Sequence, residues 1–306
     1  MRCKMTTTFA GVTFQNPVST CSGTYGFGIE YAEFVPVERL GSITTKGLSI
    51  LPKKGNAGVR ITETPAGMLN CIGLENPGAA SFKRDYIPKM HEKLGECKII
   101  ANISGATLEE YQEISASLNE VDEIAMYEVN ISCPNVKAGG LAFGTECASA
   151  AEVCRIVKKE TSKPVLMKLS PNVTNIVEIA KACEDAGADG LALINTLLGM
   201  SIDINRQTPV LGNITGGLSG PCIRPVGVRM VWQVSQAVSI PILGMGGISC
   251  WQDAVEYILA GAQMVAVGAA NFANPMVPIE VLEGLQNYCE SHQIEDVNDL
   301  VGKAWK

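Results

Sequence analysis

The sequence predicts an α/β protein that forms a single closed (β/α)8 barrel of the TIM type over residues 1–306. Three observations support this fold class. Short apolar runs alternate along the chain with amphipathic stretches of helical period. Most of these runs are apolar at every position, as strands buried on both faces of a parallel sheet are. No change of composition divides the 306 residues, a length that suits one barrel of about 250 residues with added loops.

Eight apolar runs are predicted to form the barrel strands. They span residues 17–23, 42–48, 98–105, 126–132, 164–170, 190–196, 240–248 and 264–270. A doubly wound open sheet is the alternative arrangement. It is disfavoured because no GxGxxG turn opens a helix after the first strand.

Helical patterns separate the strands, most clearly over residues 76–94, 107–118, 147–160, 173–186, 223–238 and 250–260. Thr107 and Glu110 have the spacing of a capping box, and Ser249 is the predicted N-cap of the last of these helices. Residues 6–17 are predicted to form a hairpin that caps the bottom of the barrel. Residues 49–77 and 197–220 are long connections, which in a barrel lie on the C-terminal face, where active sites are found.

Composition excludes several classes of function. The net charge of −7 is unlike the basic surface of a nucleic-acid-binding protein. Eleven cysteines are scattered without CxxC spacing, so we expect no bound metal or iron–sulfur cluster, and reduced thiols in a cytoplasmic protein. The chain has neither a signal-peptide h-region nor an apolar run long enough to cross a membrane.

Polar residues gather at the predicted carboxyl ends of the strands. A polar residue at a single strand end can be interpreted as a hydrogen-bonded cap of the strand. A buried lysine without a partner, however, is strongly unfavourable. Two lysines and three asparagines around one barrel mouth therefore predict an anionic ligand rich in hydrogen-bonding groups. In strand order the residues are Ser22-Gly23, Lys46-Gly47, Asn102, Asn130, Lys168, Asn195-Thr196, Gly246-Gly247 and Gly268-Ala269.

The last two strands end in glycine-containing turns, GMGGI and VGAAN, that are predicted to bind phosphate through backbone N–H groups. The GGLSG segment over residues 216–220 is predicted to be a further turn, which adds donors before a helix. Tight packing of a turn is the other interpretation of such glycines.

The segment NISCPN, residues 130–135, places Cys133 just after the fourth strand, where Pro134 holds the chain in an extended turn. An inert buried thiol is the better interpretation of the other ten cysteines. At position 133 the polar surroundings favour a function, since a free thiol has a pKa of about 8.5 and can act as a general base.

These motifs, together with TTKGL, NCIGLENPG and INT, resemble the family 1 dihydroorotate dehydrogenases, and among them most closely the type 1B catalytic subunit. The resemblance covers nearly the whole chain in order. It implies an FMN cofactor across the barrel mouth. The implied cofactor-binding residues are Ser22, Lys46, Gly47, Asn102, Asn130, Lys168, Ile194, Gly220, Gly246, Gly247, Gly268 and Ala269. Ala269 stands where relatives often carry threonine, so phosphate would meet only backbone there.

The same resemblance implies oxidation of dihydroorotate to orotate in de novo pyrimidine (UMP) biosynthesis. Cys133 would take the proton from ring carbon C5, while hydride leaves C6 for flavin N5, and Lys168 would stabilise the reduced flavin. The implied substrate-binding residues are Lys46, Asn70, Cys71, Ile72, Gly73, Leu74, Asn130, Asn195 and Thr196. Cys71 is interpreted as a spacer within this loop.

The type 1B resemblance implies a homodimeric core within a heterotetramer, where a partner subunit with FAD and a 2Fe-2S cluster passes electrons to NAD. This chain has no Rossmann fingerprint or cluster ligands of its own. Alternatives are a fumarate-dependent type 1A homodimer and a dihydropyrimidine (uracil or thymine) dehydrogenase-like subunit. A tRNA dihydrouridine synthase is disfavoured by the acidic net charge, and a non-catalytic protein by the polar residues at the mouth.

Overall fold

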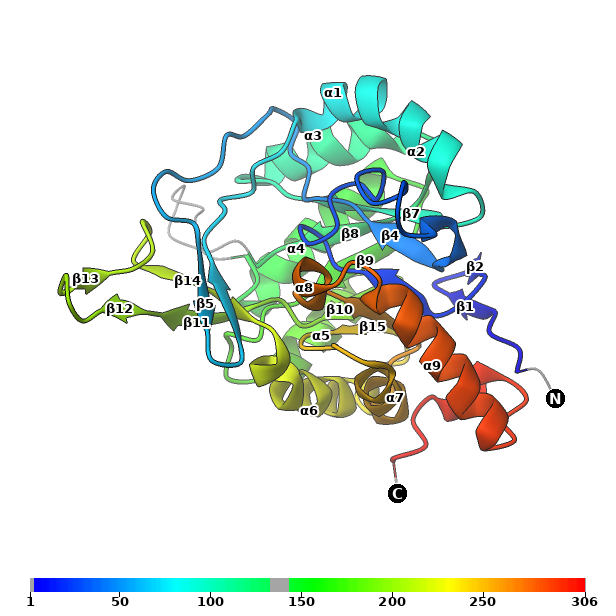
Figure 1. The fold of residues 1–306 in the computed structure, drawn as a ribbon. Coiled ribbons are helices and arrows are strands. Elements are labelled where there is room, and N and C mark those ends of the chain that lie inside the picture. Colours follow the sequence, from blue (N-terminus) through cyan, green and yellow to red (C-terminus); the bar gives the residue numbers. More distant parts are fainter. Residues whose placement is uncertain (1–2, 133–142, 306) are drawn as a thin grey trace.

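The computed structural model describes residues 3–132 and 143–305. In this part of the chain, eight parallel strands close into a barrel in sequence order (Figure 1). They are β3 (Val18–Thr20), β4 (Ser42–Thr44), β7 (Lys98–Ile103), β8 (Ile124–Asn130), β9 (Val165–Lys168), β10 (Gly190–Leu193), β15 (Ile242–Met245) and β16 (Met264–Val267). The last strand, β16, pairs with the first, β3. The predicted barrel is confirmed, although its strands end earlier than predicted because their last residues form the loops of the mouth.

Helices surround the barrel and bury its outer face. They are α1 (Gly78–Ser81), α2 (Ile87–Leu94), α3 (Leu108–Asn119), α4 (Cys147–Glu160), α5 (Ile176–Asp185), α6 (Arg224–Ser235), α7 (Trp251–Ala260), α8 (Ala270–Ala273) and α9 (Val277–Ser291). Short 3₁₀ turns span Val37–Arg39, Pro221–Ile223 and Val297–Leu300. The predicted helix over residues 76–94 is interrupted by a π-helical turn, Phe82–Tyr86. Pro88 lacks the N–H group that would continue regular hydrogen bonding there.

The two predicted helix caps have different outcomes. Thr107 caps α3, since its hydroxyl accepts from the Glu110 N–H at 3.2 Å. The prediction for Ser249 is wrong by one residue, because Cys250 is the N-cap of α7. Asp253 explains the shift: its carboxylate accepts from the backbone N–H groups of both Ser249 and Cys250, which moves Ser249 outside the helix.

The predicted N-terminal hairpin is present and closes the bottom of the barrel. It consists of β1 (Thr7–Phe9) and β2 (Val12–Phe14), paired antiparallel. The two-residue turn between them has positive φ at both positions, as tight hairpins of this type require. Phe9 and Phe14 are buried and pack on side chains of the barrel interior, among them Met126 and Leu166.

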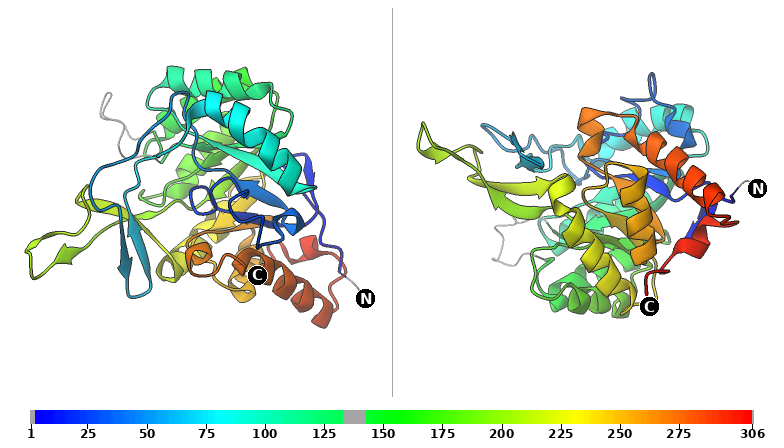
Figure 2. Two further views of the ribbon diagram at one scale, coloured as in Figure 1. Left: turned by 45° about the horizontal axis from the view of Figure 1, so that its top comes forward. Right: turned by 60° about the horizontal axis from the view of Figure 1, so that its bottom comes forward.

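The two long connections, expected as loops, instead pair with each other. β11 (Leu197–Met200), β14 (Thr215–Ser219), β6 (Gly67–Asn70) and β5 (Ile61–Thr64) form one antiparallel sheet in that order. A small ladder of β12 (Ile202–Asp203) and β13 (Thr208–Pro209) extends it. We call these six strands the arm. It projects from the barrel on the side away from both termini (Figures 1 and 2). The prediction that residues 216–220 form a turn is wrong, since residues 216–219 lie within β14.

Across residues 3–132 and 143–305, none of the helices has the length and apolarity that a membrane crossing requires.

Candidate active site

The structure brings the predicted site residues together at the carboxyl ends of the barrel strands. Each lies on the last residues of its strand or in the loop that follows. Ser22 follows β3, Lys46 and Gly47 follow β4, Asn102 is in β7, Asn130 and Lys168 end β8 and β9, Ile194, Asn195 and Thr196 follow β10, Gly246 and Gly247 follow β15, and Gly268 and Ala269 follow β16. Because parallel strands share one direction, all of these positions surround the same mouth.

A buried ionic network lies just inside this mouth. The ammonium of Lys168 donates to Glu128 Oε1 at 3.0 Å, and the Asn102 amide donates to the same oxygen at 2.6 Å. Side-chain exposure is only 6% for Lys168 and 0% for Glu128. A lysine in such a place requires a counter-charge, and Glu128 supplies it.

Glu128 is a site residue that the sequence predictions missed. It is an acidic residue inside the otherwise apolar strand segment MYEVN, and it pairs in register with Asn102. That isolated charge in a predicted buried strand was the available signal. It could not say whether Glu128 faces the barrel interior or the helices.

Two oxygens of this network have no hydrogen-bond partner within the described residues. They are Glu128 Oε2 and Asn102 Oδ1, and both are buried. A Cβ atom at Gly47 would lie 2.9 Å from Asn102 Oδ1, so glycine leaves the approach to this oxygen open. Unsatisfied buried acceptors are costly, and a ligand with N–H groups would satisfy them.

Two of the three predicted asparagines, Asn130 and Asn195, link the ends of two strands through a chain of hydrogen bonds. Asn195 donates to Asn130 Oδ1 at 3.4 Å, and the same oxygen accepts from the Ser132 N–H at 3.1 Å. The Thr196 N–H donates to Asn195 Oδ1 at 2.8 Å. These bonds hold both amide side chains in fixed orientations at the mouth.

The predicted substrate loop, residues 70–74, reaches the mouth through the arm. Asn70 donates to the Gly217 carbonyl at 3.3 Å. Gly217 in turn packs against Thr196 so closely that a Cβ atom there would collide with the threonine hydroxyl. Gly73 and Leu74 have positive φ, and the Leu74 side chain lies beside Gly47. Cys71 and Ile72 are held by backbone bonds to Arg60 and Asn56.

Lys46 provides a positive charge that the described residues leave without a salt bridge. The pKa of Glu75 is lowered from its usual value, first by the hydrogen bond from Arg60 and then by the positive charge of Lys46. Arg60 Nη1 and Glu75 Oε2 are 2.6 Å apart, so these two residues form a salt bridge with each other. Lys46 is a half-buried residue, and its positive charge is therefore available to an anion at the mouth.

The glycine turns pack backbone against backbone. Gly246, Gly247 and Gly220 all have positive φ. A Cβ atom at Gly247 would lie 2.8 Å from the Gly220 carbonyl and 2.9 Å from the Arg224 nitrogen, so only glycine allows this approach. The loops after β14 and β15 thus form one glycine-lined wall near the start of α6, which lets backbone N–H groups approach an anion.

Arg224 lies beside this wall and was not predicted as a site residue. It forms an ion pair with Asp253, the acidic residue that also orders Ser249 and Cys250. Cys133, the predicted general base, lies outside the described residues. Its neighbour Ser132 is anchored at the mouth, because the Ser132 hydroxyl donates to the Lys168 carbonyl at 3.2 Å.

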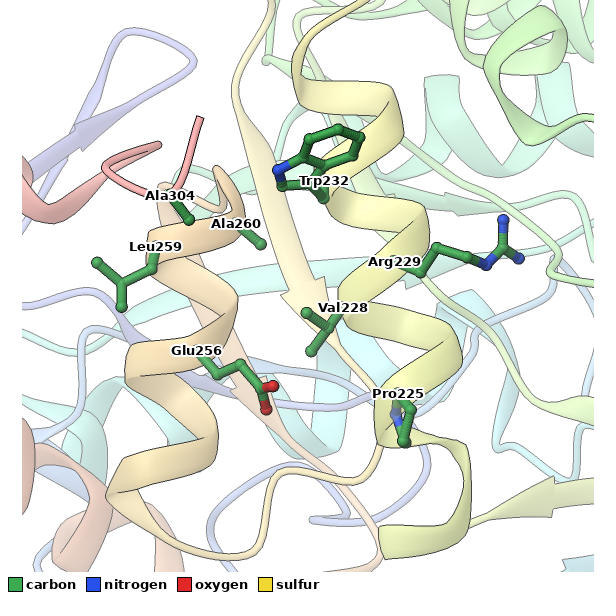
Figure 3. A pocket seen from close by; sticks show the side chains of 8 residues that line it. All are labelled: Pro225, Val228, Arg229, Trp232, Glu256, Leu259, Ala260 and Ala304. Carbon is green, nitrogen blue, oxygen red and sulfur yellow. The ribbon is translucent and has the colours of Figure 1, made fainter. Parts of the chain in front are cut away.

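A separate hollow of about 470 Å³ lies between α6 and α7 (Figure 3). Its lining includes Val228, Trp232 and Leu259, with Ala304 near the C-terminal end. None of the predicted site residues lines it. Because α6 and α7 cover the outside of the barrel, this hollow is not part of the candidate site.

A closed parallel barrel with ionic, amide and glycine groups at one mouth is the architecture of an α/β-barrel enzyme. The family model for dihydroorotate dehydrogenase matches residues 4–288. The chain belongs to this family of oxidoreductases.

Several relatives match nearly the full length of the chain. The chain is 53% identical over 293 residues to the "Dihydroorotate dehydrogenase B (NAD(+)), catalytic subunit" of Geotalea uraniireducens, with 96% of this chain and 95% of the relative covered. The proteins of the same name from Desulforamulus reducens and Brachyspira hyodysenteriae are 55% and 52% identical. The alignment with the Desulforamulus reducens protein covers 94% of this chain and 94% of the relative, and the alignment with the Brachyspira hyodysenteriae protein covers 97% of both.

Proposed function

We propose that this chain is an FMN-dependent catalytic subunit that oxidises dihydroorotate to orotate in pyrimidine biosynthesis. The observation that carries the proposal is the convergence of Lys46, Lys168, three asparagines and the glycine turns at one barrel mouth. The positive charge of Lys46, which has no salt bridge among the described residues, and the amide side chains suit an anionic pyrimidine, and a glycine-lined wall suits a phosphate. Family membership over residues 4–288 and relatives named for this activity support the same function.

The residues present fit FMN. Asn102 Oδ1 is a buried acceptor without a partner, and the flavin ring edge carries an N–H donor. Lys168 would lie at the N1/O2 edge as a fixed positive charge. Ser22, Lys46, Gly47, Asn130 and Ile194 would line the ring and ribityl chain. Backbone groups of Gly220, Gly246, Gly247, Gly268 and Ala269 would hold the phosphate.

The proposed substrate site uses the other face of the mouth. Lys46 would bind the dihydroorotate carboxylate, since its ammonium has no salt-bridge partner among the described residues. Asn70, Asn130, Asn195 and Thr196 would bind the ring amides. The hydrogen bonds among Asn130, Asn195 and Thr196, and the bond from Asn70 to the Gly217 carbonyl, orient these residues before the substrate arrives, which lowers the entropy cost of alignment.

Cys133 is the proposed general base that removes the proton from ring carbon C5. Ser132, next in the chain, is hydrogen-bonded to β9, so Cys133 follows directly from an anchored residue of the mouth. When bound, FMN supplies the acceptor for hydride at N5. Loss of the thiol would remove general-base catalysis, which contributes about 10²- to 10⁴-fold to a rate.

The proposed acceptor is NAD, reached through a partner subunit with FAD and a 2Fe-2S cluster. The relatives are named as catalytic subunits of an NAD(+) enzyme, and this chain has no Rossmann fingerprint. We propose a homodimeric core within a heterotetramer, acting in the cytoplasm. The fumarate-dependent type 1A enzyme is less well supported because the names of the relatives specify NAD(+).

A visible spectrum of the purified chain tests the proposal. We expect a yellow protein whose flavin band bleaches on addition of dihydroorotate but not of uracil. An artificial acceptor should restore the colour in repeated cycles, whereas NAD and fumarate should not. A chain that takes up no FMN, or that bleaches with uracil, contradicts the proposed function. Rapid re-oxidation by fumarate favours type 1A instead.

The variant Cys133→Ala tests the general base. We expect its flavin content to match that of the unmodified chain, while bleaching by dihydroorotate slows by about 10²- to 10⁴-fold. Stopped-flow absorbance measures the rate. Bleaching at an unchanged rate would remove Cys133 from the mechanism and leave the cofactor assignment intact.

A further inference from the structure

Glu128 places a carboxylate in the interior of the barrel, directly above its apolar layer. Side chains alternate along β8, so Met126, Glu128 and Asn130 share the inward face. Met126 is part of the buried apolar cluster below. Glu128 itself is completely buried. A carboxylate in these surroundings is strongly unfavourable unless a cation compensates it.

The compensation is reciprocal. Within residues 3–132 and 143–305, Lys168 is the cation within salt-bridge distance of Glu128, and Glu128 is the anion within that distance of Lys168. Both Lys168 and Asn102 donate to the same oxygen, Oε1. One carboxylate oxygen thus fixes the positions of two side chains that line the proposed flavin site.

A compensated lysine affects a neighbouring ligand less than a free one does. The field of the Lys168 ammonium is partly cancelled by a carboxylate 3.0 Å away, in surroundings that screen charges weakly. A positive charge beside a flavin favours its reduced, more negative form. Loss of the carboxylate charge would therefore make the bound flavin easier to reduce.

We propose that Glu128 is a positioning residue that fixes Lys168 and Asn102 and, by cancelling part of the lysine charge, keeps the reduction potential of the bound flavin low. This inference rests on the proposed function, because it requires FMN at the mouth. A low potential suits a cofactor that must pass its electrons towards NAD, which is a weak oxidant.

The test is the midpoint potential of the bound flavin in Glu128→Gln, measured by equilibration with a reference dye. Glutamine keeps the shape and an oxygen that accepts both hydrogen bonds, but it removes the charge. We expect the ratio of reduced to oxidised flavin at a fixed ambient potential to rise at least tenfold, which is about 30 mV for a two-electron couple. An unchanged or lowered potential overturns the proposal.

Asp189→Asn is the matched control. Asp189 also pairs with a lysine, Lys158, at 2.6 Å, but it precedes β10 at the opposite end of the barrel. Its loss should leave the flavin potential unchanged. If the role of Glu128 were merely structural, Glu128→Gln would lower the thermal unfolding temperature, as Asp189→Asn would, but would not raise the flavin potential.

Glu128→Asp keeps the proposal testable if Glu128→Gln does not fold or retain flavin. It preserves the charge but withdraws the carboxylate by one methylene, so we expect a potential above that of the unmodified chain. In that case an unchanged potential in Glu128→Asp overturns the inference. An unmodified chain that takes up no FMN overturns the proposed function and this inference together, whereas a yellow one with unresponsive variants overturns the inference alone.

Discussion

Burial determines the protonation of single cysteines in the barrel and in its surrounding helices. The pKa of the Cys21 thiol is raised to about 12, mainly by burial, with the positive charge of Lys168 opposing the rise and the negative charge of Glu128 adding to it. The pKa values of Cys154 and Cys289 are likewise raised to about 12 by burial. These thiols are therefore neutral in the folded protein near pH 7.

Thiol labelling checks this prediction. N-ethylmaleimide should modify the exposed Cys222 before Cys21, Cys154 and Cys289, which should resist at both pH 7 and pH 9, because only thiolates react readily. Mass spectrometry of the digested protein identifies the labelled positions. Labelling of Cys21 at the rate of Cys222 would contradict the assignment, and full labelling in denaturant is the control.

The same shifts predict a fall in stability at alkaline pH. Unfolded thiols lose protons near pH 9, whereas the folded ones hold them to about pH 12. Between these values the unfolded chain binds fewer protons, so the free energy of unfolding falls as the pH rises. The folded state therefore keeps its full stability only below about pH 8, and loses stability progressively between about pH 9 and pH 12.

At the level of elements, the arm connects two distant loops to the mouth. β6 carries Asn70 and β14 carries Gly217, and the two strands are paired. The close approach continues at Gly220, which has a φ of 103° and whose Cβ atom, if present, would lie 2.6 Å from the Gly67 Cα. This contact joins the glycine-lined wall to β6, the strand that leads into the proposed substrate loop.

Gly220→Ala tests this contact against Gly187→Ala. Both glycines have positive φ, but a Cβ atom at Gly187 would meet nothing within 4 Å. Both variants bear the backbone strain, and only Gly220→Ala adds a clash. We expect its free energy of unfolding to fall by about 1–3 kcal/mol more than that of Gly187→Ala, and its FMN to dissociate more readily. Equal effects in chemical denaturation would contradict the role of the contact.

At the level of the whole molecule, the two ends of the barrel differ in composition: one is closed by apolar side chains and the other is surrounded by polar residues. The hairpin closes the bottom with Phe9 and Phe14, and the polar residues surround the top. The buried ionic network lies between them. Stability and ligand binding are therefore expected to respond to different substitutions.

Phe9→Ala should destabilise the fold without altering the site. Phe9 is 1% exposed and packs against Gly190. Its loss should cost about 3–5 kcal/mol of unfolding free energy, measured by denaturant titration, while the flavin spectrum and the bleaching rate stay unchanged at low temperature. Ile204→Ala, at an 83% exposed position in the turn between β12 and β13, is the control and should change neither. A changed flavin spectrum in Phe9→Ala would mean that the two ends are coupled.

Local patterns in the sequence determined the barrel and most of the candidate site. A buried parallel strand is apolar throughout and ends in polar residues, so Lys46, Asn130 and Lys168 could be placed at one mouth from neighbouring residues alone. The hairpin was equally local, since its turn and its two phenylalanines lie within six consecutive residues, 9–14.

Tertiary structure decided what depends on distant partners. The pairing of β6 with β14 joins residues about 150 positions apart, and neither segment reveals the other. Cys250 replaced Ser249 as a cap because of where Asp253 reaches. Glu128 can face the barrel interior because Lys168 and Asn102 donate hydrogen bonds to its carboxylate there. A strand pattern fixes which residues alternate, but only packing against other strands decides which charge is buried and what compensates it.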